Sequence, residues 1–406
     1  MTPIVWEWVR LCLRWLHVIA GIAWIGSSFY FIALDLSLRR RDGLPAGTSG
    51  EAWQVHGGGF YRMMKYLVAP PELPEDLTWF MWEAYTTWIS GFLLLCAVYY
   101  VQPELFLIDP RILDLPDGAG IAIGLLSLAA GWVAYDRLCK SRLGANDVTL
   151  VAAGYVLLVG AAILFTHVFG GRAAFVHTGA LIGTMMVANV FFIIIPNQRK
   201  VVASLLAGQT PDPMLGKQAK QRSLHNNYLT LPVLFLMIST HYPLTFASRW
   251  NWAIVAVVLV MGAVIRHFFN SRHAGKPVPW WTWAVAAVGL AIIIALGSQG
   301  PADRDTAAAA SPTGGATAAA PGFAVVEDIV TSRCAMCHAA VPVWDGIATA
   351  PKGVRLDSPT EIRRHAPQIL IQAVLTNAMP PANLTGITAG ERAALAAWLA
   401  HGAAAS

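Results

Sequence analysis

Eight segments of the chain are apolar over a length that can cross a membrane as a helix. They cover residues 11–38, 77–101, 119–139, 148–167, 173–196, 227–241, 250–269 and 280–296. The composition agrees with a membrane protein, because 56% of the residues are hydrophobic, only 13% are charged, and 16 are tryptophans, which collect at bilayer interfaces. The sixth segment is short and contains Pro232. We therefore predict an all-α chain in which an eight-helix transmembrane bundle, embedded in a lipid bilayer, occupies residues 1–297.

Basic residues are unevenly distributed among the connections between these segments. The connections after the first, third, fifth and seventh segments hold most of them, whereas those after the second, fourth and sixth hold only Arg111, Arg172 and Arg249. Basic connections stay in the cytoplasm, so both termini are expected on the periplasmic side of a bacterial inner membrane. The net charge of +5 is small and spread over short connections, so nucleic acid is not a predicted partner.

The sequence Cys-Ala-Met-Cys-His, which begins at Cys334, has the spacing at which a c-type haem is attached. Cys334 and Cys337 can add to the two vinyl groups of one porphyrin, and His338 then supplies an imidazole to the iron. Met379 is placed where a small cytochrome c offers a thioether as sixth ligand, whereas Met336, between the two cysteines, has no route to the far face of the haem. The alternatives are a chance C-x-x-C in a loop and half of a zinc site. Because c-type haem is attached in the periplasm, the motif and the charge pattern give the same orientation.

The end of the chain divides into a linker and a small domain. Residues 298–321 are rich in Ala, Pro, Gly, Ser and Thr and lack apolar periodicity, so we predict a flexible tether. Residues 322–406 are expected to form a periplasmic domain, whose last helix would begin with the capping box Thr-Ala-Gly-Glu at 388–391. The apolar face of this helix would consist of Leu395, Trp398 and Leu399. Val325 and Ile329 would give the first helix of the domain a matching face. Such a helix pair is expected of a small class I cytochrome c.

The histidines before the tether fall into two layers of the predicted bundle. The outer layer holds His17, His167, His177 and His241, and the inner layer holds His56, His225, His267 and His273. Ionisable side chains inside a membrane are costly and point to function, and paired imidazoles would suit one or two b-type haems held between helices. The predicted haem-binding residues are His17, His177, His167, His241, His225 and His267, with His17 and His177 as iron ligands. The alternatives are ordinary helix packing and histidines at the membrane interface.

Polar residues towards the inner side are candidates for a substrate site. Three consecutive glycines after His56 expose backbone N–H groups that suit an anion, and Arg62 and Lys65 follow them. His56, or Glu83 inside the second segment, is a candidate base. A cluster at the start of the sixth segment, suited to the edges of a planar polar molecule, consists of His225, Asn226, Asn227 and Tyr228; the last three are the predicted substrate-binding residues. The alternatives are a flexible turn, an ion pair for Glu83 and a helix cap. The chain has no nucleotide-binding glycine motif, so haem is the expected electron acceptor.

Several stretches carry a known pattern when they are taken together. They are RWLH at 14–17 with WIGSSFY at 24–30, the stretch 53–61, WFMWEAY at 79–85, and the stretch 225–237. In combination they resemble the bacterial membrane-bound urate oxidase family, which joins an eight-span domain to a C-terminal cytochrome c. The first segment alone is also similar to that of membrane protoporphyrinogen oxidase and of copper-resistance membrane proteins.

The resemblance implies oxidation of urate to 5-hydroxyisourate, with electrons passed by haems to the covalent c haem and then to a soluble cytochrome c or a terminal oxidase, without peroxide. Urate is an anion at neutral pH, so Arg62, Lys65 or the glycine N–H groups are its expected ligands, and His56 or Glu83 is its expected base. Two hypotheses compete with this one. The first is a haem-relay dehydrogenase for quinol or another substrate, and the second is a haem-handling or redox-sensing membrane protein without enzymatic activity.

Overall fold

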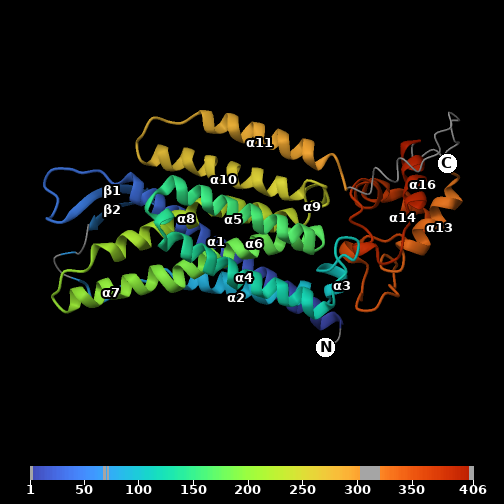
Figure 1. Ribbon diagram of the computed structural model, residues 1–406, viewed down its shortest axis with the longest axis horizontal. Helices are drawn as coiled ribbons and strands as arrows, with labels where there is room; N and C mark the ends of the chain where they lie inside the picture. The colour runs from blue at the N-terminus through green and yellow to red at the C-terminus, as the bar shows by residue number, and fades with distance from the viewer. Residues whose placement is uncertain (1–2, 67–69, 71–72, 302–320, 402–406) are drawn as a thin grey trace.

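The computed structural model describes residues 3–66, 70, 73–301 and 321–401, and the chain is mostly helical (Figure 1). The helices of the first 300 residues are α1 (Pro3–Ser37), α2 (Trp82–Leu95), α3 (Pro103–Phe106), α4 (Asp117–Lys140), α5 (Asp147–Val168), α6 (Gly171–Ala188), α7 (Ile195–Leu206), α8 (Pro213–Ser239), α9 (Pro243–Phe246), α10 (Asn251–His273) and α11 (Trp281–Gly297). A π-helical turn, Cys96–Tyr100, extends α2, and a second one, Asn189–Ile194, joins α6 to α7 in one long helix. The helical character predicted from the sequence is therefore confirmed for most of the chain.

Each of the eight apolar segments lies mostly in helix, although residues 77–81 of the second precede α2, and five helices are long and apolar enough to cross a membrane. These five are Ile4–Ser37, Asp117–Lys140, Asp147–Val168, Gly171–Leu206 and Asn251–His273. The remaining three predicted segments lie in α2 with its extension, in the second half of α8, and in α11. Five long apolar helices are compatible with a membrane protein.

The sixth predicted segment differs most from the structure. It belongs to α8, which begins at Pro213 and carries Pro232 in its interior. A proline within a helix removes a backbone hydrogen bond and crowds the preceding turn. The ring of Pro232 lies against Gly262 of α10, where a side chain would collide with it. The two helices therefore pack closely at the proline, and the helix continues through it.

Residues 48–66, between the first two predicted membrane segments, form an antiparallel hairpin, so the prediction of an all-α chain is wrong here. Strand β1 (Thr48–His56) pairs with β2 (Gly59–Tyr66), with Trp53 opposite Arg62. The two-residue turn consists of Gly57 and Gly58, whose φ angles of 57° and 80° lie in the left-handed region that glycine adopts without strain. The glycines thus close a hairpin, as a two-residue Gly-Gly turn between β-forming residues should.

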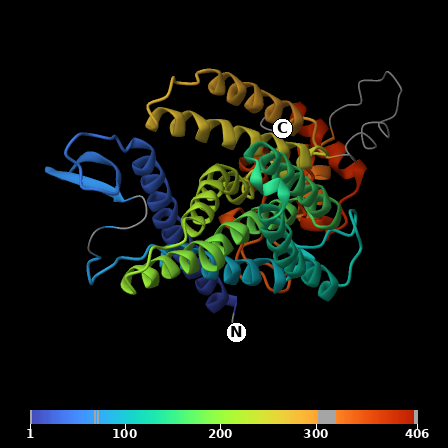
Figure 2. The same cartoon turned by 60° about the vertical axis from the view of Figure 1, so that its left-hand side comes forward.

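The hairpin and the C-terminal domain lie at opposite ends of the helical region (Figure 1). The N-terminus lies at the end nearer the C-terminal domain, and Figure 2 shows the hairpin projecting away from the helices. The main core is formed by α4, α5, α6, α8 and α10, and its largest fully buried side chains include Phe165, Phe169 and Phe175. In contrast, α1 exposes Trp8, Trp15 and Ile22 by 62–68%, an outward apolar face that suits contact with lipid.

The C-terminal domain is helical and has its own core. Its helices are α13 (Phe323–Arg333), α14 (Pro359–Arg364), α15 (Ala366–Ile369), the π-helical turn Leu370–Leu375, and α16 (Ala389–Ala400). The capping box of α16 is confirmed, because Thr388 and Glu391 exchange both hydrogen bonds. Ile329 packs in the core as predicted, but Val325 is 49% exposed and Val326 takes its place, since the buried face of α13 is shifted by one residue. Most of the predicted tether, residues 302–320, lies outside the described residues.

Candidate functional site

A large cavity with a volume of about 1330 Å³ lies between the helical region and the C-terminal domain. Its C-terminal wall includes all four residues predicted to hold a c haem, namely Cys334, Cys337, His338 and Met379. Met336 is not among the lining residues, as expected from its place between the cysteines. Two thiols, one imidazole and one thioether on one cavity are the donor set that a covalent haem requires, so these residues fit the group.

The haem-motif residues are held by backbone hydrogen bonds. The Nδ1 of His338 lies 2.9 Å from the carbonyl oxygen of Val354, which fixes the tautomer and leaves Nε2 as the metal-binding atom. Burial lowers the pKa of His338, so the imidazole is neutral at pH 7. The Met379 loop is held by Arg392, whose guanidinium donates to the Met379 carbonyl oxygen at 3.0 Å. Burial raises the pKa of the Cys334 thiol to about 11. The free thiol is therefore protonated at neutral pH, and a protonated thiol is a weak nucleophile.

The helical wall of the same cavity includes His17 and His241. The Nδ1 of His17 lies 2.9 Å from the carbonyl oxygen of Thr87, so Nε2 again carries the lone pair. Gly91 of α2 makes room for this ring, because a Cβ there would lie 2.7 Å from Cε1 of His17. The cavity is also lined by the small residues Gly21 and Gly183 and by the arginines Arg10, Arg14 and Arg172. This wall combines an open imidazole, small residues and cations, which are the groups that a b-type haem with its two propionates needs.

His177 is placed differently from His17, although both belong to the predicted outer layer. It is fully buried, and its Nδ1 lies 2.8 Å from the carbonyl oxygen of Ala173. Its Nε2 lies 3.0 Å from the hydroxyl of Tyr100. Both ring nitrogens are therefore engaged, and His177 does not line the cavity. His167, the fourth histidine of this layer, lines a second cavity of about 420 Å³.

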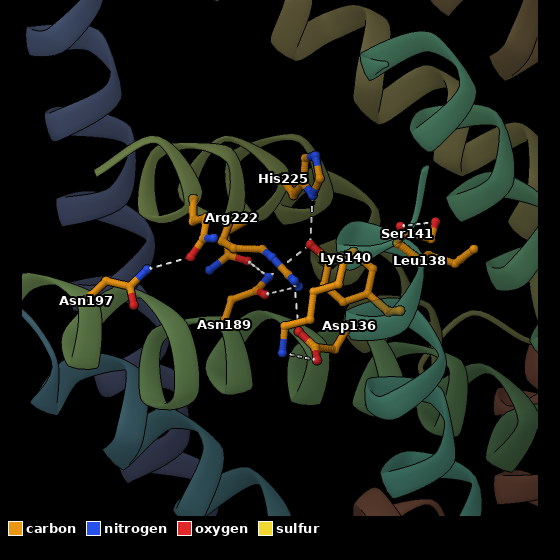
Figure 3. Close-up of polar contacts among 11 residues, drawn as sticks. Asp136, Leu138, Lys140, Ser141, Asn189, Asn197, Arg222 and His225 are labelled. Atoms are coloured by element: carbon orange, nitrogen blue, oxygen red, sulfur yellow. Dashed lines mark hydrogen bonds and ion pairs between the residues drawn. The ribbon is translucent and has the colours of Figure 1, made fainter. Parts of the chain in front are cut away.

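A polar network links α4, the π-helical turn Asn189–Ile194 and α8 (Figure 3). Arg222, only 3% exposed, pairs with Asp136 at 2.8 Å and donates to Oδ1 of Asn189 at 3.1 Å. The hydroxyl of Tyr135 lies 2.7 Å from Nδ1 of His225. The amide of Asn189 donates to that hydroxyl at 3.2 Å and to Oδ1 of Asn226 at 2.9 Å. This set, which we call the Arg222 network, pairs its buried charge with a carboxylate.

A second polar cluster, absent from the sequence prediction except for Asn227, lies between α1, α8 and α10. Oδ1 of Asn227 accepts from Nε of Arg266 at 3.3 Å and from Nδ2 of Asn270 at 3.0 Å. Nη2 of Arg266 donates to Oδ1 of Asn270 at 3.1 Å. The guanidinium carbon lies 3.9 Å from the centre of the Phe29 ring. We call these four residues the Arg266 cluster. The sequence signal for it was a charged residue inside an apolar helix.

One family profile matches the chain. Its description is Urate oxidase N-terminal, and it matches residues 3–297. The chain belongs to this family. Comparison with curated proteins and with solved structures finds no match. Membership in a urate oxidase family implies an oxidoreductase related to urate oxidation, and the matched region is the helical part together with the hairpin.

The residues predicted to hold urate do not form one site in this family member. His56 is exposed at the hairpin turn, Glu83 is half-buried in α2, and neither lines the two cavities described above. Arg62 pairs with Glu51 at 2.5 Å and Lys65 pairs with Asp35, so both cations already have carboxylates. The others lie elsewhere: Asn226 in the Arg222 network, Asn227 in the Arg266 cluster, and Tyr228 beside the exposed His267, with 3.4 Å between its hydroxyl and Nδ1.

Proposed function

We propose that the protein is a membrane-bound oxidoreductase that oxidises urate to 5-hydroxyisourate and delivers the electrons, through haem, to a soluble cytochrome c or a terminal oxidase rather than to oxygen. The family match supports urate as the substrate, and the residues that line one cavity support the proposed transfer of electrons through haem. That cavity is lined on one side by the C-x-x-C-H motif with Met379 and on the other by His17. Groups bound on its two walls would lie in one continuous space.

The reaction must balance without peroxide. Urate and one water give 5-hydroxyisourate, two electrons and two protons. The water supplies the new oxygen atom, and a base must take a proton from urate or from the attacking water. His56 and Glu83 remain the proposed bases. Because the electrons leave as a pair and each haem holds one, two reduced haems, of type b or c, are expected per urate consumed.

The C-terminal domain would hold one covalent haem through Cys334 and Cys337, with Nε2 of His338 and the sulfur of Met379 as iron ligands. When bound, haem supplies one-electron redox chemistry. The chain's own residues position these donors. Val354 orients the imidazole of His338, and Arg392 fixes the loop that carries Met379.

The helical region would hold at least one b-type haem against His17 and His241, with Arg10, Arg14 and Arg172 near its propionates. These five residues line the same cavity. Haem binding by the outer histidine His167, and a second haem at the inner residues His225 and His267, remain predictions from the sequence. His177 is not assigned to the b haem in this proposal, because both its ring nitrogens have partners within the chain. Figure 1 supports the orientation of the outer site, because the N-terminus lies at the same end as the C-terminal domain. By the charge rule this end is periplasmic and the hairpin is cytoplasmic.

The test is urate-dependent reduction of the purified full-length protein. Urate added without oxygen should convert the oxidised haem spectrum to the reduced one, at two haems per urate consumed when haem b and haem c are counted together. A pyridine haemochrome assay should find both haem types. A protein whose haem spectrum does not respond to urate would refute the proposed activity. A protein with haem c alone would remove the b-haem part and leave urate oxidation standing.

A further inference from the structure

Arg266 is 5% exposed and forms no ion pair with any carboxylate in the described part of the chain. Its guanidinium instead contacts the neutral side chains of Asn227, Asn270 and Phe29. A buried charge without a counter-charge is strongly unfavourable in a low-dielectric interior. The Arg222 network shows the usual solution in the same bundle, since Asp136 lies 2.8 Å from its arginine. The Arg266 cluster is therefore suited to an anion from outside the chain.

Asn227 gives a second and independent indication. Its side chain is fully buried, and its Nδ2 has no hydrogen-bond partner among the described residues. The orientation of the amide is fixed, because Nε of Arg266 can only donate and the atom that faces it must be the oxygen. An unsatisfied buried N–H costs free energy that a bound acceptor would recover. A cation and a free donor thus belong to one buried cluster.

The position of the cluster relates it to the proposed haem cavity. Ile25 of α1 lines that cavity, and Phe29 of the cluster is one helical turn further along the same helix, about 6 Å by the rise of an α-helix. An anion bound at Arg266 would therefore lie close to the inner end of the cavity. Phe29 and His17 belong to the same helix, about 18 Å apart along its axis by the rise of an α-helix.

We propose that Arg266 and Asn227 form the site that binds the urate anion, with Arg266 as counter-charge and Nδ2 of Asn227 as donor to a urate oxygen. This inference rests on the proposed function, because it names the substrate site of that reaction. It replaces Arg62 and Lys65, whose charges are neutralised by Glu51 and Asp35. The planar, oxygen-rich urate anion matches a guanidinium and an amide, which both donate in one plane.

The decisive variant is Asn227→Asp, which places a carboxylate beside Arg266 without changing the size of the side chain. It supplies the counter-charge internally and removes the free donor. We expect the urate Kd to rise at least ~30-fold, the change that follows from losing a buried charged contact, with no fall in the thermal unfolding midpoint. The urate Kd is measured by equilibrium dialysis of labelled urate against full-length protein that has been reduced with dithionite. The reduced protein cannot accept electrons from urate, so urate binds without being consumed.

The matched control is Asn189→Asp. Asn189 also accepts a hydrogen bond from a buried arginine, but that arginine already has Asp136. Its urate Kd should stay within about twofold of the wild type, even if the variant is less stable. Arg266→Lys provides a second test, because lysine keeps the charge and loses the planar fork. It should weaken urate binding by an intermediate factor.

The outcomes separate the two proposals. If the wild type is reduced by urate and Asn227→Asp binds urate as the wild type does, the site assignment is wrong and the proposed function stands. An equal loss of affinity in Asn189→Asp would also overturn the assignment, because it would reflect general disruption. If the wild type neither binds urate nor is reduced by it, the proposed function itself fails.

Discussion

Arg222 and Arg266 occupy the same half of the helical bundle and are buried to nearly the same extent, at 3% and 5% exposure, yet their surroundings differ. Arg222 has a carboxylate, Asp136, and lies in a network in which several amides and a phenol bond one another (Figure 3). Arg266 has only neutral partners among the described residues, and one of them, Asn227, has an unused donor. The chain itself supplies the counter-charge of Arg222, whereas the counter-charge of Arg266 is proposed to come from a bound ligand.

The histidines of the outer layer repeat this contrast. His177 uses both ring nitrogens within the chain, on Ala173 and Tyr100. His17 places Nδ1 against Thr87 and a neighbouring hydroxyl, and it lines the large cavity. Burial makes an unpaired polar atom costly, and at His17 and Asn227 the proposed ligands would offset that cost. His177, whose ring nitrogens both have partners, shows only how the helices are held together.

The largest effect is expected for the two histidines. His17→Ala should lose the b haem nearest the C-terminal domain completely, because it removes the open imidazole, while the c haem stays attached. His177→Ala should retain that b haem, although it leaves the Tyr100 hydroxyl without its partner. Haemochrome assays on both purified variants measure this difference. Equal loss of haem b in both variants would make His177 a ligand and break the comparison.

The next effect concerns Asp136. Asp136→Asn would leave Arg222 buried without a carboxylate, which should lower the free energy of unfolding by about 3–5 kcal/mol. The midpoint of thermal unfolding in detergent reports this loss. A variant as stable as the wild type would show that Arg222 tolerates an unpaired state, and the distinction between the two arginines would lose its basis.

Arg266→Met should behave in the opposite way in the absence of urate. It removes a buried charge that has no counter-charge, and methionine fills a similar volume, so the unfolding free energy should stay within about 1 kcal/mol of the wild type or rise. Thermal unfolding with and without urate is the measurement. Urate should stabilise the wild type and not this variant, and a destabilisation as large as that of Asp136→Asn would contradict the open-site assignment.

The smallest effect is expected in the hairpin, where the Arg62 side chain that pairs with Glu51 is 44% exposed. The hydrogen bond from Arg62 lowers the pKa of Glu51 below its ordinary value of 4.5. The pairing therefore stabilises the hairpin above about pH 4.5 and is lost as the pH falls through the lowered pKa. Tryptophan fluorescence of Trp53, which also donates to Glu51, should follow this change. Glu51→Gln should remove it, and a pH response that persists in this variant would point to another group.

Much of the C-terminal domain could be predicted because its information is local. The C-x-x-C-H motif is contiguous, and the capping box at Thr388 and Glu391 depends on a spacing of three residues. The hairpin was missed although its signal was present, since Gly57 and Gly58 form a two-residue turn between residues that favour strands. The short, charged connection between two apolar segments indicated a loop, whereas the Gly-Gly turn allows the flanking residues to pair as two strands.

The Arg266 cluster could not be predicted from the sequence, because its members are far apart in the chain. Phe29, Asn227 and Asn270 come from three helices, and only their packing reveals that Arg266 has no carboxylate. From the sequence, Arg62 and Lys65 are better candidates for anion ligands than Arg266, because the linear order does not identify Glu51 and Asp35 as their partners. Spacing predicts contacts within a helix, but it does not say which charge is already neutralised.

The large cavity is bounded by both the helical region and the C-terminal domain. Redox groups seated on its two walls would exchange electrons inside a single molecule. The rate of that exchange would depend on the tunnelling distance, so neither collision frequency nor solvent viscosity would limit it. Dilution of the enzyme would then slow only the last transfer, to the external acceptor.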